Sequence, residues 1–469
     1  MWEDDEIREE CGVFGIYGDP AAAKLTFLGL YALQHRGQES SGMAVSDGDH
    51  IESHRAMGLV SEAYEHGDRV ADLDGHIAIG HNRYSTTGTS NVDNAQPFMV
   101  NFKRGQLATA HNGNFTNTGA LHLSMEETGS IFRTSSDSEI VLHLIARSNE
   151  PDLPSMISDA LRHVEGAYSI VFLSGTQLIG VRDPRGFRPL CLGRIGDAHV
   201  LASETCAFDI MNAEYVREVN PGEMVVIDEN GIQSYFPFDR AEPASCIFEY
   251  IYFARPDSKV FGENSDKFRR RFGRRLAEEH PVNADIVIAV PDSATTAALG
   301  YSEHSGIRFE IGLIRNHYVG RSFIDPDQSM REFTVRLKYN PVQGVLRNRR
   351  VVLVDDSIVR GTTLNQLVRL IRSAGASEVH VRISSPPIRH PCYYGIDMQS
   401  RGELIASQTR VDEIRTYLGA DSLGYLSIEG MVKIAKEYGK SGTGYCTACF
   451  SGDYPVVPED SLNKLMLES

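Results

Sequence analysis

The sequence predicts two architectures in one chain, an antiparallel α+β domain followed by a parallel α/β domain. Its 469 residues are too many for one ordinary core, since domains typically hold about 100–200 residues. Up to about residue 240, short β-rich runs alternate with turn signals, whereas from about residue 285 strands, tight loops and helices follow one another. The segment from Pro237 to Pro243 is the predicted join between the two parts.

Antiparallel sheets covered by helices account for the pattern of the front part. Three β-rich runs predict strands at residues 77–80, 168–173 and 224–227. The last run leads into Asn230-Gly231, a dipeptide typical of tight hairpins. Helical patterns at about 21–35 and 137–147 lie between such runs, as expected of an α+β layered domain.

A parallel sheet is predicted in the rear part. The continuous apolar runs 286–290 and 351–354 each end in a polar loop, as do strands that are buried on both faces. One helix face, with an end near Gly375, is predicted by residues at i, i+3, i+4 and i+7, which are Leu364, Leu367, Val368 and Ile371. Alternating apolar residues at 379–383 predict the next strand. Ligands of such sheets lie beyond the carboxyl ends of the strands, so the polar loops are where a site is expected.

Composition excludes several classes of protein. The formal net charge is −17, and a surface that acidic repels nucleic-acid backbones. No apolar run approaches the ~20 residues of a membrane span, and the acidic first ten residues lack the pattern of a secretion signal. Seven cysteines are too few for a disulfide scaffold. We therefore expect a cytoplasmic enzyme that binds neither nucleic acid nor membrane.

Cys11 is a candidate nucleophile. A thiol needs a base to become reactive at neutral pH, and no histidine lies nearby in the sequence. Removal of residues 1–10 would free the α-amino group of Cys11, whose usual pKa of roughly 7.7–8.0 suits proton transfer. The alternative, from this segment alone, is a buried structural cysteine behind a terminal tail.

Four further segments carry a resemblance to a known family. They are Leu33–Gly42, His81–Thr86, His111–Asn114 and Ser135–Glu139. In this order, and together with Cys11, they resemble the αββα glutaminase domain of N-terminal-nucleophile amidotransferases. Glutamine hydrolysis passes through an oxyanion that needs preorganised donors. The resemblance implies that these donors are the Asn112 side chain and the Gly113 amide, with Cys11 as the nucleophile.

The resemblance also implies how free glutamine is held. Arg83 suits the α-carboxylate through a forked, charge-assisted pair, and Asp137 suits the α-ammonium group. The residues alone leave two alternatives, a surface ion pair for Arg83 and a helix N-cap for Asp137. The capping role and the ligand role of Asp137 are compatible.

The clearest motif of the rear part runs from residue 351 to residue 363. It is a buried strand followed by two carboxylates and a small-residue loop that opens a helix. Adjacent carboxylates suit a ribose diol and its Mg²⁺, and amides and hydroxyls at a helix start bind a phosphate monoester. The segment lacks the G-K-[ST] of a nucleotide P-loop and resembles the phosphoribosyl pyrophosphate (PRPP) loop of type I phosphoribosyltransferases. The residues expected to bind PRPP here are Asp355, Asp356, Ser357, Gly361, Thr362 and Thr363.

Two other segments complete the expected PRPP site. The loop Pro291–Thr296 ends the preceding parallel strand, and its Ser293 is a candidate contact for pyrophosphate or, with Asp355 and Asp356, for Mg²⁺. Residues 321–340 are polar, basic and interrupted by proline, which is typical of a lid over an anionic substrate or of a plain solvated loop. Lys338 in this segment is the candidate contact for pyrophosphate.

Four cysteines form a second candidate metal site. The C-x-x-C motif at residues 446–449 suits redox chemistry, zinc or an iron–sulfur cluster, and spacing does not separate the last two. The redox interpretation expects a helix start and a thioredoxin-like context, which the sequence lacks. A resemblance to the iron–sulfur subgroup of glutamine PRPP amidotransferases implies a [4Fe–4S] cluster on Cys246, Cys392, Cys446 and Cys449. Cys191 and Cys206 match no motif and are expected in the core.

The basic run Lys267–Arg275 is the feature that favours nucleic-acid binding. Phe268, Phe272 and Leu276 recur every four residues, which places the arginines on the solvent side of an amphipathic helix. In a chain of net charge −17, pairing of this face with acidic neighbours or subunits is the preferred interpretation.

Residues 11 to 455 as a whole resemble the iron–sulfur, propeptide-bearing amidophosphoribosyltransferases (glutamine PRPP amidotransferases). The resemblance implies a propeptide at 1–10, a glutaminase domain at 11–240, and a phosphoribosyltransferase domain at 241–469 with a C-terminal cluster-binding segment. The implied reaction converts glutamine and PRPP to 5-phosphoribosylamine, glutamate and pyrophosphate, with ammonia passing between the sites, at the entry to purine synthesis. Homotetramers and inhibition by purine nucleotides are implied as well.

Two alternatives differ in their functional class. Another N-terminal-nucleophile amidotransferase, such as one that aminates a sugar phosphate, would carry a sugar isomerase domain without the loop Asp355–Thr363. A non-catalytic PRPP-sensing regulator would need a basic helix-turn-helix module where the glutaminase motifs stand. The sequence argues against both.

Overall fold

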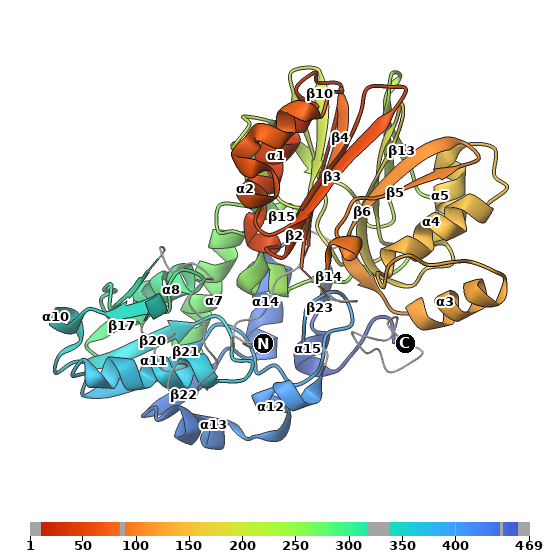
Figure 1. Ribbon diagram of the computed structural model, residues 1–469. Coiled ribbons are helices and arrows are strands. Elements are labelled where there is room, and N and C mark those ends of the chain that lie inside the picture. The colour runs from red at the N-terminus through yellow and green to blue at the C-terminus, as the bar shows by residue number, and fades with distance from the viewer. Residues whose placement is uncertain (1–10, 85–89, 317–336, 399, 441–443, 458–469) are drawn as a thin grey trace.

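The computed structural model describes residues 11–84, 90–316, 337–398, 400–440 and 444–457. The predicted propeptide at 1–10 and most of the predicted lid at 321–340 lie outside the described residues. Figure 1 shows two bodies, one coloured red to yellow-green and one green to blue. The first holds two antiparallel sheets and the second a parallel sheet, so the predicted fold classes are confirmed.

Two antiparallel sheets packed face to face form the front body. In sheet order, the seven-stranded sheet consists of β11 (Glu214–Glu218), β9 (Cys191–Ile195), β10 (Ala198–Ala202), β1 (Gly12–Tyr17), β4 (Ile77–Arg83), β2 (Ser40–Ser46) and β3 (Ile51–Met57). The six-stranded sheet consists of β13 (Gly231–Tyr235), β12 (Met224–Asp228), β8 (Leu178–Arg182), β7 (Gly166–Ser174), β6 (Gly105–Phe115) and β5 (Phe98–Phe102). The three predicted strands fall within β4, β7 and β12, and the predicted hairpin joins β12 to β13.

Alternation of side chains along the strands produces an αββα layering. Val13 of β1 packs with Val171 of β7 in the core between the sheets, whereas its neighbour Phe14 packs with Leu30 of α1 on the outer face. On the other outer face, Met156 of α5 packs against Phe172. The helices are α1 (Ala22–Ala32), α2 (Val60–Ala63), α3 (Thr118–Glu127), α4 (Ser138–Arg147), α5 (Leu153–Leu161) and α6 (Cys206–Asp209). Short 3₁₀ helices cover Gln34–Arg36, Glu65–Asp72 and Val92–Asn94.

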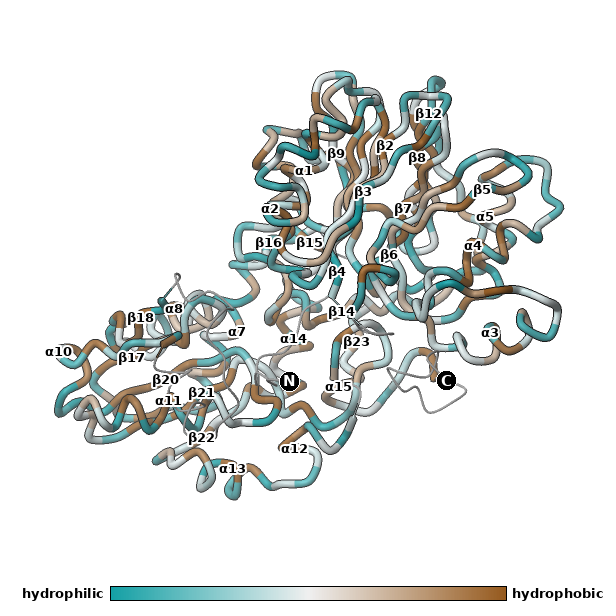
Figure 2. Tube along the Cα trace, in the orientation of Figure 1, coloured by the Kyte–Doolittle hydropathy of each residue, from teal (hydrophilic) through white to brown (hydrophobic). Residues whose placement is uncertain are grey.

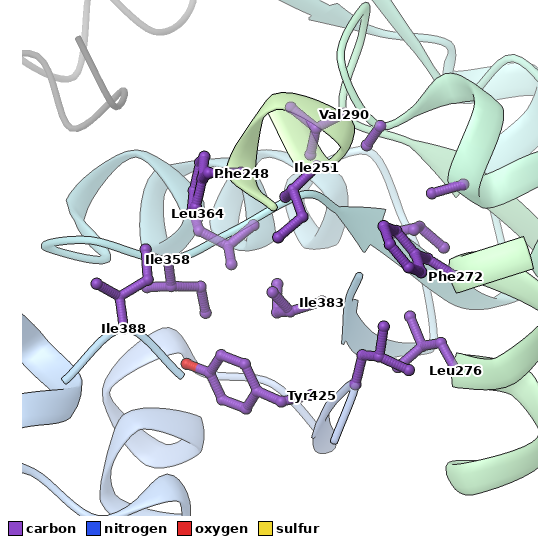
Figure 3. Packing of buried hydrophobic residues seen from close by; sticks show 14 of the residues in the cluster. Phe248, Ile251, Phe272, Leu276, Val290, Ile358, Leu364, Ile383, Ile388 and Tyr425 are labelled. Atoms are coloured by element: carbon purple, nitrogen blue, oxygen red, sulfur yellow. The ribbon is translucent and has the colours of Figure 1, made fainter. Parts of the chain in front are cut away.

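A four-stranded parallel sheet with helices around it forms most of the rear body. Its strand order is β17 (Ile286–Ala289), β20 (Arg350–Asp355), β21 (Glu378–Ile383) and β22 (Ser422–Tyr425). Helices and short strands around it are α7 (Ser265–Glu279), α8 (Thr295–Ser305), β18 (Leu313–Arg315), β19 (Tyr339–Pro341), α10 (Gln343–Leu346), α11 (Thr362–Ser373), a 3₁₀ turn (Arg401–Glu403), α12 (Ile405–Gln408), α13 (Val411–Leu418) and α14 (Ile428–Tyr438). Figure 3 shows the core, with Leu364 of α11 and Phe272 of α7 on either side of Ile383.

Short elements join the two bodies near residues 245–264 and at the C-terminal end. They are β14 (Ser245–Cys246), a π-helix (Glu249–Phe253), β15 (Lys259–Val260), β16 (Glu263–Asn264), β23 (Tyr445–Cys446) and α15 (Ala448–Ser451).

In Figure 2 the hydrophobic residues concentrate where the sheets and helices pack, and hydrophilic residues dominate many outer loops. No helix of the described residues has both the length and the apolarity needed to cross a membrane.

The basic helix α7 corrects one prediction. Phe268, Phe272 and Leu276 are buried as expected, and Arg270 and Arg274 pair with Glu303 on the surface. Arg269, however, is buried rather than solvent-facing, because its guanidinium donates to the backbone carbonyls of residues 250, 252 and 254. The periodicity of a helix does not predict that backbone carbonyls will accept the hydrogen bonds of a buried guanidinium.

Candidate active sites and a four-cysteine site

Cys11 directly precedes β1, a central strand of its sheet. The residue is 8% exposed, its Sγ lies 3.4 Å from the Tyr84 carbonyl oxygen, and its own carbonyl accepts a 3.2 Å hydrogen bond from Nε of Arg36. Burial raises the pKa of the Cys11 thiol to about 11, although the Tyr84 contact and the Arg83 charge oppose this. A thiol in these surroundings needs a nearby base before it becomes nucleophilic.

Arg83 and Asp137 lie close enough to Cys11 for their charges to affect its pKa. Arg83 ends β4, is 3% exposed, and has Nη1 3.7 Å from a carboxylate oxygen of Glu39. Burial lowers the pKa of Arg83, with the charges of Cys11, Glu39 and Asp137 opposing it. The surface ion pair considered for Arg83 is therefore wrong, because the guanidinium is buried beside the candidate nucleophile.

Asp137 directly precedes helix α4, but its side chain does not cap that helix. Its carboxylate instead accepts hydrogen bonds from the Phe115 N–H at 3.0 Å and from the Ser138 hydroxyl at 3.1 Å. Burial alone would raise the pKa of Asp137, yet the His111 ring and these hydrogen bonds hold it below its ordinary value. An ionised, buried carboxylate suits the ammonium group of an amino acid.

Asn112 and Gly113 lie on β6, the strand that pairs with β7. Asn112 is fully buried, and neither its side-chain oxygen nor its side-chain nitrogen has a hydrogen-bond partner among the described residues. An orphaned buried polar group costs about 1–3 kcal/mol, which a ligand can relieve. Gly113 has φ +145°, and a Cβ there would lie 2.0 Å from the Ala167 carbonyl oxygen, so this position accepts only glycine.

His81 gives a prediction about acid stability. Its ring is fully buried against the His111 carbonyl at 2.9 Å, and burial lowers its pKa to about 3. The unfolded chain protonates this ring near pH 6.5 while the folded chain does not, so the free energy of unfolding falls as pH falls from about 6.5 to about 3, by at most ~1.4 kcal/mol per pH unit. Urea unfolding of His81→Gln at pH 7, 6 and 5 should show a weaker pH dependence than the unchanged protein.

A matched control for this prediction is His50→Gln, since His50 is exposed. This control should keep the pH dependence of the unchanged protein. Equal slopes for His81→Gln and the unchanged protein would show that His81 does not carry the effect.

The structure brings Ser293 to the acidic loop after β20. Because β17 and β20 are adjacent parallel strands, their carboxyl-end loops meet. The hydroxyls of Ser293 and Ser357 each donate to a carboxylate oxygen of Asp356 at 2.5 Å, and the Asp356 N–H donates to Asp355 at 2.9 Å. Asp356 is buried and Asp355 half-buried.

The remaining predicted PRPP contacts lie around the start of α11 and before β19. Gly361 has φ +79° and precedes α11, while Thr362 is exposed and Thr363 half-buried in the first turn. Nζ of Lys338 lies 5.8 Å from the centre of the Tyr339 ring, and the Asn316 N–H donates to its carbonyl. Contact between Lys338 and the loop after β20 remains a prediction.

The four predicted cysteines meet at the junction of the two bodies. Parallel pairing of β14 with β23 places Cys246 opposite Cys446, and the N–H groups of residues 389 and 390 donate to the Cys449 carbonyl. One cavity is lined by all four cysteines together with Phe187, Phe248, Tyr394, Ile396, Ala448 and Tyr454. Burial raises the pKa of Cys246 to about 12 and those of Cys446 and Cys449 above their usual value. A short helix, α15, starts within the C-x-x-C motif, although the sequence indicated no helix start there.

A different group of described residues has donor atoms within 4.8 Å of one another, namely His35, Glu204 and Cys206. The Glu204 carboxylate already accepts hydrogen bonds from His35 at 2.7 Å and from Arg36 at 2.5 Å. A second acid, Glu249 of the π-helix, binds Arg36 at 2.7 Å. The arginine charge disfavours a cation here, so we interpret the group as a buried ion-pair network. The sequence did not predict this network, although Arg36 lies within the segment Leu33–Gly42.

Fold and sites together define a class, an N-terminal-nucleophile type of glutaminase domain joined to a phosphoribosyltransferase-type α/β domain. Residues 81–209 match a family described as "Glutamine amidotransferase domain". The chain is 52% identical over 460 residues to the chloroplastic amidophosphoribosyltransferase of Glycine max, covering 98% of this chain and 80% of that protein. It is 49% identical over 452 residues to the amidophosphoribosyltransferase of Bacillus subtilis (strain 168), covering 96% and 95%. The chain belongs to the amidophosphoribosyltransferase family.

Solved structures agree with this assignment. A glutamine PRPP amidotransferase from B. subtilis, complexed with ADP and GMP, has a TM-score of 0.90 and 48% identity, covering 95% of this chain and 97% of that one. A structure described as the allosteric regulatory enzyme of purine biosynthesis has a TM-score of 0.92 at 48% identity, covering 96% of this chain and 98% of that one. The whole described architecture is therefore shared with a solved enzyme.

Proposed function

We propose that this chain transfers the amide nitrogen of glutamine to PRPP, giving 5-phosphoribosylamine, glutamate and pyrophosphate, the first step of purine synthesis. As a family member it is an enzyme, both a glutamine amidotransferase and a glycosyltransferase. The observation that carries the proposal is the buried Asn112 amide, which has no hydrogen-bond partner within the described part of the chain and lies in the same body as Cys11. The other body brings Ser293 to Asp356. The first feature suits an oxyanion and the second a sugar phosphate.

In the proposed glutaminase step, the Cys11 sulfur attacks the amide carbon of glutamine. The α-amine of Cys11, freed by removal of residues 1–10, takes the thiol proton and passes it to the departing ammonia. The Asn112 side chain and the Gly113 N–H stabilise the oxyanion, while Arg83 and Asp137 hold the α-carboxylate and α-ammonium groups. Water then hydrolyses the thioester and releases glutamate.

In the proposed transfer step, ammonia attacks C1 of the ribose and pyrophosphate leaves. The Asp355 and Asp356 carboxylates hold the ribose hydroxyls, and the segment 361–363 holds the 5-phosphate at the start of α11. Ser293, Ser357 and Lys338 are the proposed polar contacts around the pyrophosphate. The oxygen donors of Ser293, Asp355 and Asp356 fit Mg²⁺, which when bound would neutralise charge on the leaving group.

The four-cysteine cavity fits a [4Fe–4S] cluster better than zinc. A zinc ion draws four sulfurs to within about 4 Å of one another, whereas no three of these four cysteines, all of them described residues, bring their sulfurs within 4.8 Å of one another. Burial raises the pKa of these thiols and so favours their neutral form. A metal group bound by the four cysteines must therefore carry enough positive charge to stabilise them as thiolates. Cys246, Cys392, Cys446 and Cys449 would be the ligands.

This assignment predicts about four iron and four sulfide ions per chain in anaerobically purified protein, with a broad visible absorption. Cys446→Ser should lose both the iron and the absorption, because one of four ligands is removed. The control Cys206→Ala changes a buried cysteine outside the cavity and should keep them. One zinc ion per chain without sulfide would contradict the cluster.

From family membership we further propose that the protein forms homotetramers in the cytoplasm. Purine nucleotides are the proposed inhibitors, since the B. subtilis structure is named as a complex with ADP and GMP. Nucleic acids and membranes are not among the proposed partners.

The test of the function uses glutamine labelled with ¹⁵N at the amide. We expect labelled phosphoribosylamine, glutamate and pyrophosphate in equal amounts, and no aminated product when PRPP is omitted. Aminated product from a sugar phosphate would favour the alternative amidotransferase, and PRPP binding without turnover would favour the regulator. Either result would overturn the proposal.

A further inference from the structure

Glu249 is a buried carboxylate of the junction that contacts the front body. It begins the π-helix Glu249–Phe253 and is fully buried. Its oxygens accept hydrogen bonds from Arg36 at 3.0 and 2.7 Å, and Nη1 of Arg188 lies 3.8 Å from the same carboxylate. One acid of the junction therefore accepts hydrogen bonds from one arginine of the front body and lies within ion-pair range of a second.

Arg36 connects this carboxylate to the candidate nucleophile. It is 1% exposed, and its Nε donates at 3.2 Å to the carbonyl of Cys11 itself. The position of the Cys11 backbone thus depends on a guanidinium whose other nitrogens are held by Glu249 and Glu204.

Arg188 connects the same carboxylate to the candidate oxyanion site. Its Nε donates at 2.9 Å to the carbonyl of Tyr394, and the next residue, Gly395, packs on Gly113. A Cβ at Gly395 would lie 3.1 Å from the carbonyl carbon of Gly113 and 3.0 Å from Arg188. The Asn114 side chain also donates at 3.1 Å to the carbonyl of Tyr393. The strand that carries Asn112 and Gly113 is therefore buttressed by a turn that Arg188 holds.

We propose that Glu249 is a positioning residue for glutamine hydrolysis, through which the rear domain fixes the backbone of the nucleophile and that of the oxyanion donor at once. Neutralising this acid leaves two buried guanidinium groups short of negative charge, so both contacts are expected to shift. Displacements near 1 Å in such sites cost about 10²-fold in rate. This inference rests on the proposed function.

The test compares Glu249→Gln with Glu218→Gln in the full chain. Glu218 is also a buried acid at the junction, where it accepts from the Gly262 N–H at 3.2 Å, but none of its described contacts involves Cys11 or Gly113. For Glu249→Gln we expect kcat with glutamine to fall about 10²-fold, while the ammonia-dependent rate and the KM for PRPP stay within about twofold. Alkylation of Cys11 by an electrophilic glutamine analogue should slow in parallel. Glu218→Gln should keep both rates.

An unchanged glutamine rate in Glu249→Gln would overturn the inference, and so would equal losses of the glutamine and ammonia rates. Should that variant not fold, Glu249→Asp decides instead, because it keeps the charge at a shorter reach. If Glu249→Asp lowers the glutamine-dependent rate but not the ammonia-dependent rate, the inference is supported. If the two rates change equally, or neither changes, the inference is overturned. Failure of the proposed function is distinguishable, because it would appear as missing activity in the unchanged protein.

Discussion

Replacement of Cys11 by alanine is expected to abolish the glutamine-dependent reaction and to spare the ammonia-dependent one. The sulfur is the proposed attacking atom, and its loss removes the covalent pathway, so the glutamine rate should fall by at least about 10⁴-fold. Ammonia supplied in solution bypasses this step and needs only the site after β20. Alanine lacks only the sulfur atom of this buried side chain, so the fold should tolerate the change.

The measurement is phosphoribosylamine formation at saturating PRPP, with glutamine or with ammonium salt as the nitrogen donor. Cys191→Ala is the matched control, because Cys191 is a buried cysteine of the same body whose sulfur contacts Glu218 and the Lys259 carbonyl; it should keep both activities. Intact-mass analysis of the unchanged protein should show a chain that begins at Cys11. A fully active chain that begins at Met1 would rule out the α-amine as the base.

Periodicity and local motifs predicted the strands and helices in which all side chains of a given face lie in the same kind of environment. The run 351–354 is buried on both faces in a parallel sheet, and the face of Leu364, Leu367 and Ile371 packs on that sheet, so apolar spacing alone located both. The acidic loop follows that strand directly, which is why the meeting of Ser293 and Asp356 could be expected from the order of the elements.

Contacts between distant segments could not be predicted in this way. Arg36 and Glu249 are 213 positions apart, and nothing in either local sequence indicates the other. Asp137 resembles a helix cap, but the strand that ends at Phe115 supplies its partner. The packing of Gly395 on Gly113 likewise depends on how the two bodies meet. Each of these contacts depends on the tertiary structure, whereas the sequence predicted only which residue types would be present.

Asp356→Asn is expected to abolish transfer from both nitrogen donors, in contrast to Cys11→Ala. Asp356 is 6% exposed, and both of its oxygens accept hydrogen bonds, from Ser293 and Ser357. An amide in its place carries no charge for Mg²⁺ or the ribose diol, and its NH₂ group forces one serine hydroxyl to reverse its hydrogen bond. We expect kcat/KM for PRPP to fall about 10²–10³-fold, as for loss of a charged, buried contact.

Initial rates at varied PRPP and Mg²⁺, with each donor, measure this effect. The matched control is Asp285→Asn, because Asp285 pairs with Arg350 at the opposite end of the same two strands and so lies away from the edge where ligands bind. Asp285→Asn should leave the KM for PRPP unchanged. If Asp356→Asn lost only the glutamine-dependent rate, the acidic loop would serve hydrolysis rather than transfer, and the assignment of the two reactions to the two bodies would be wrong. Loss with both donors, beside the donor-specific loss in Cys11→Ala, places nitrogen release and nitrogen capture in separate bodies.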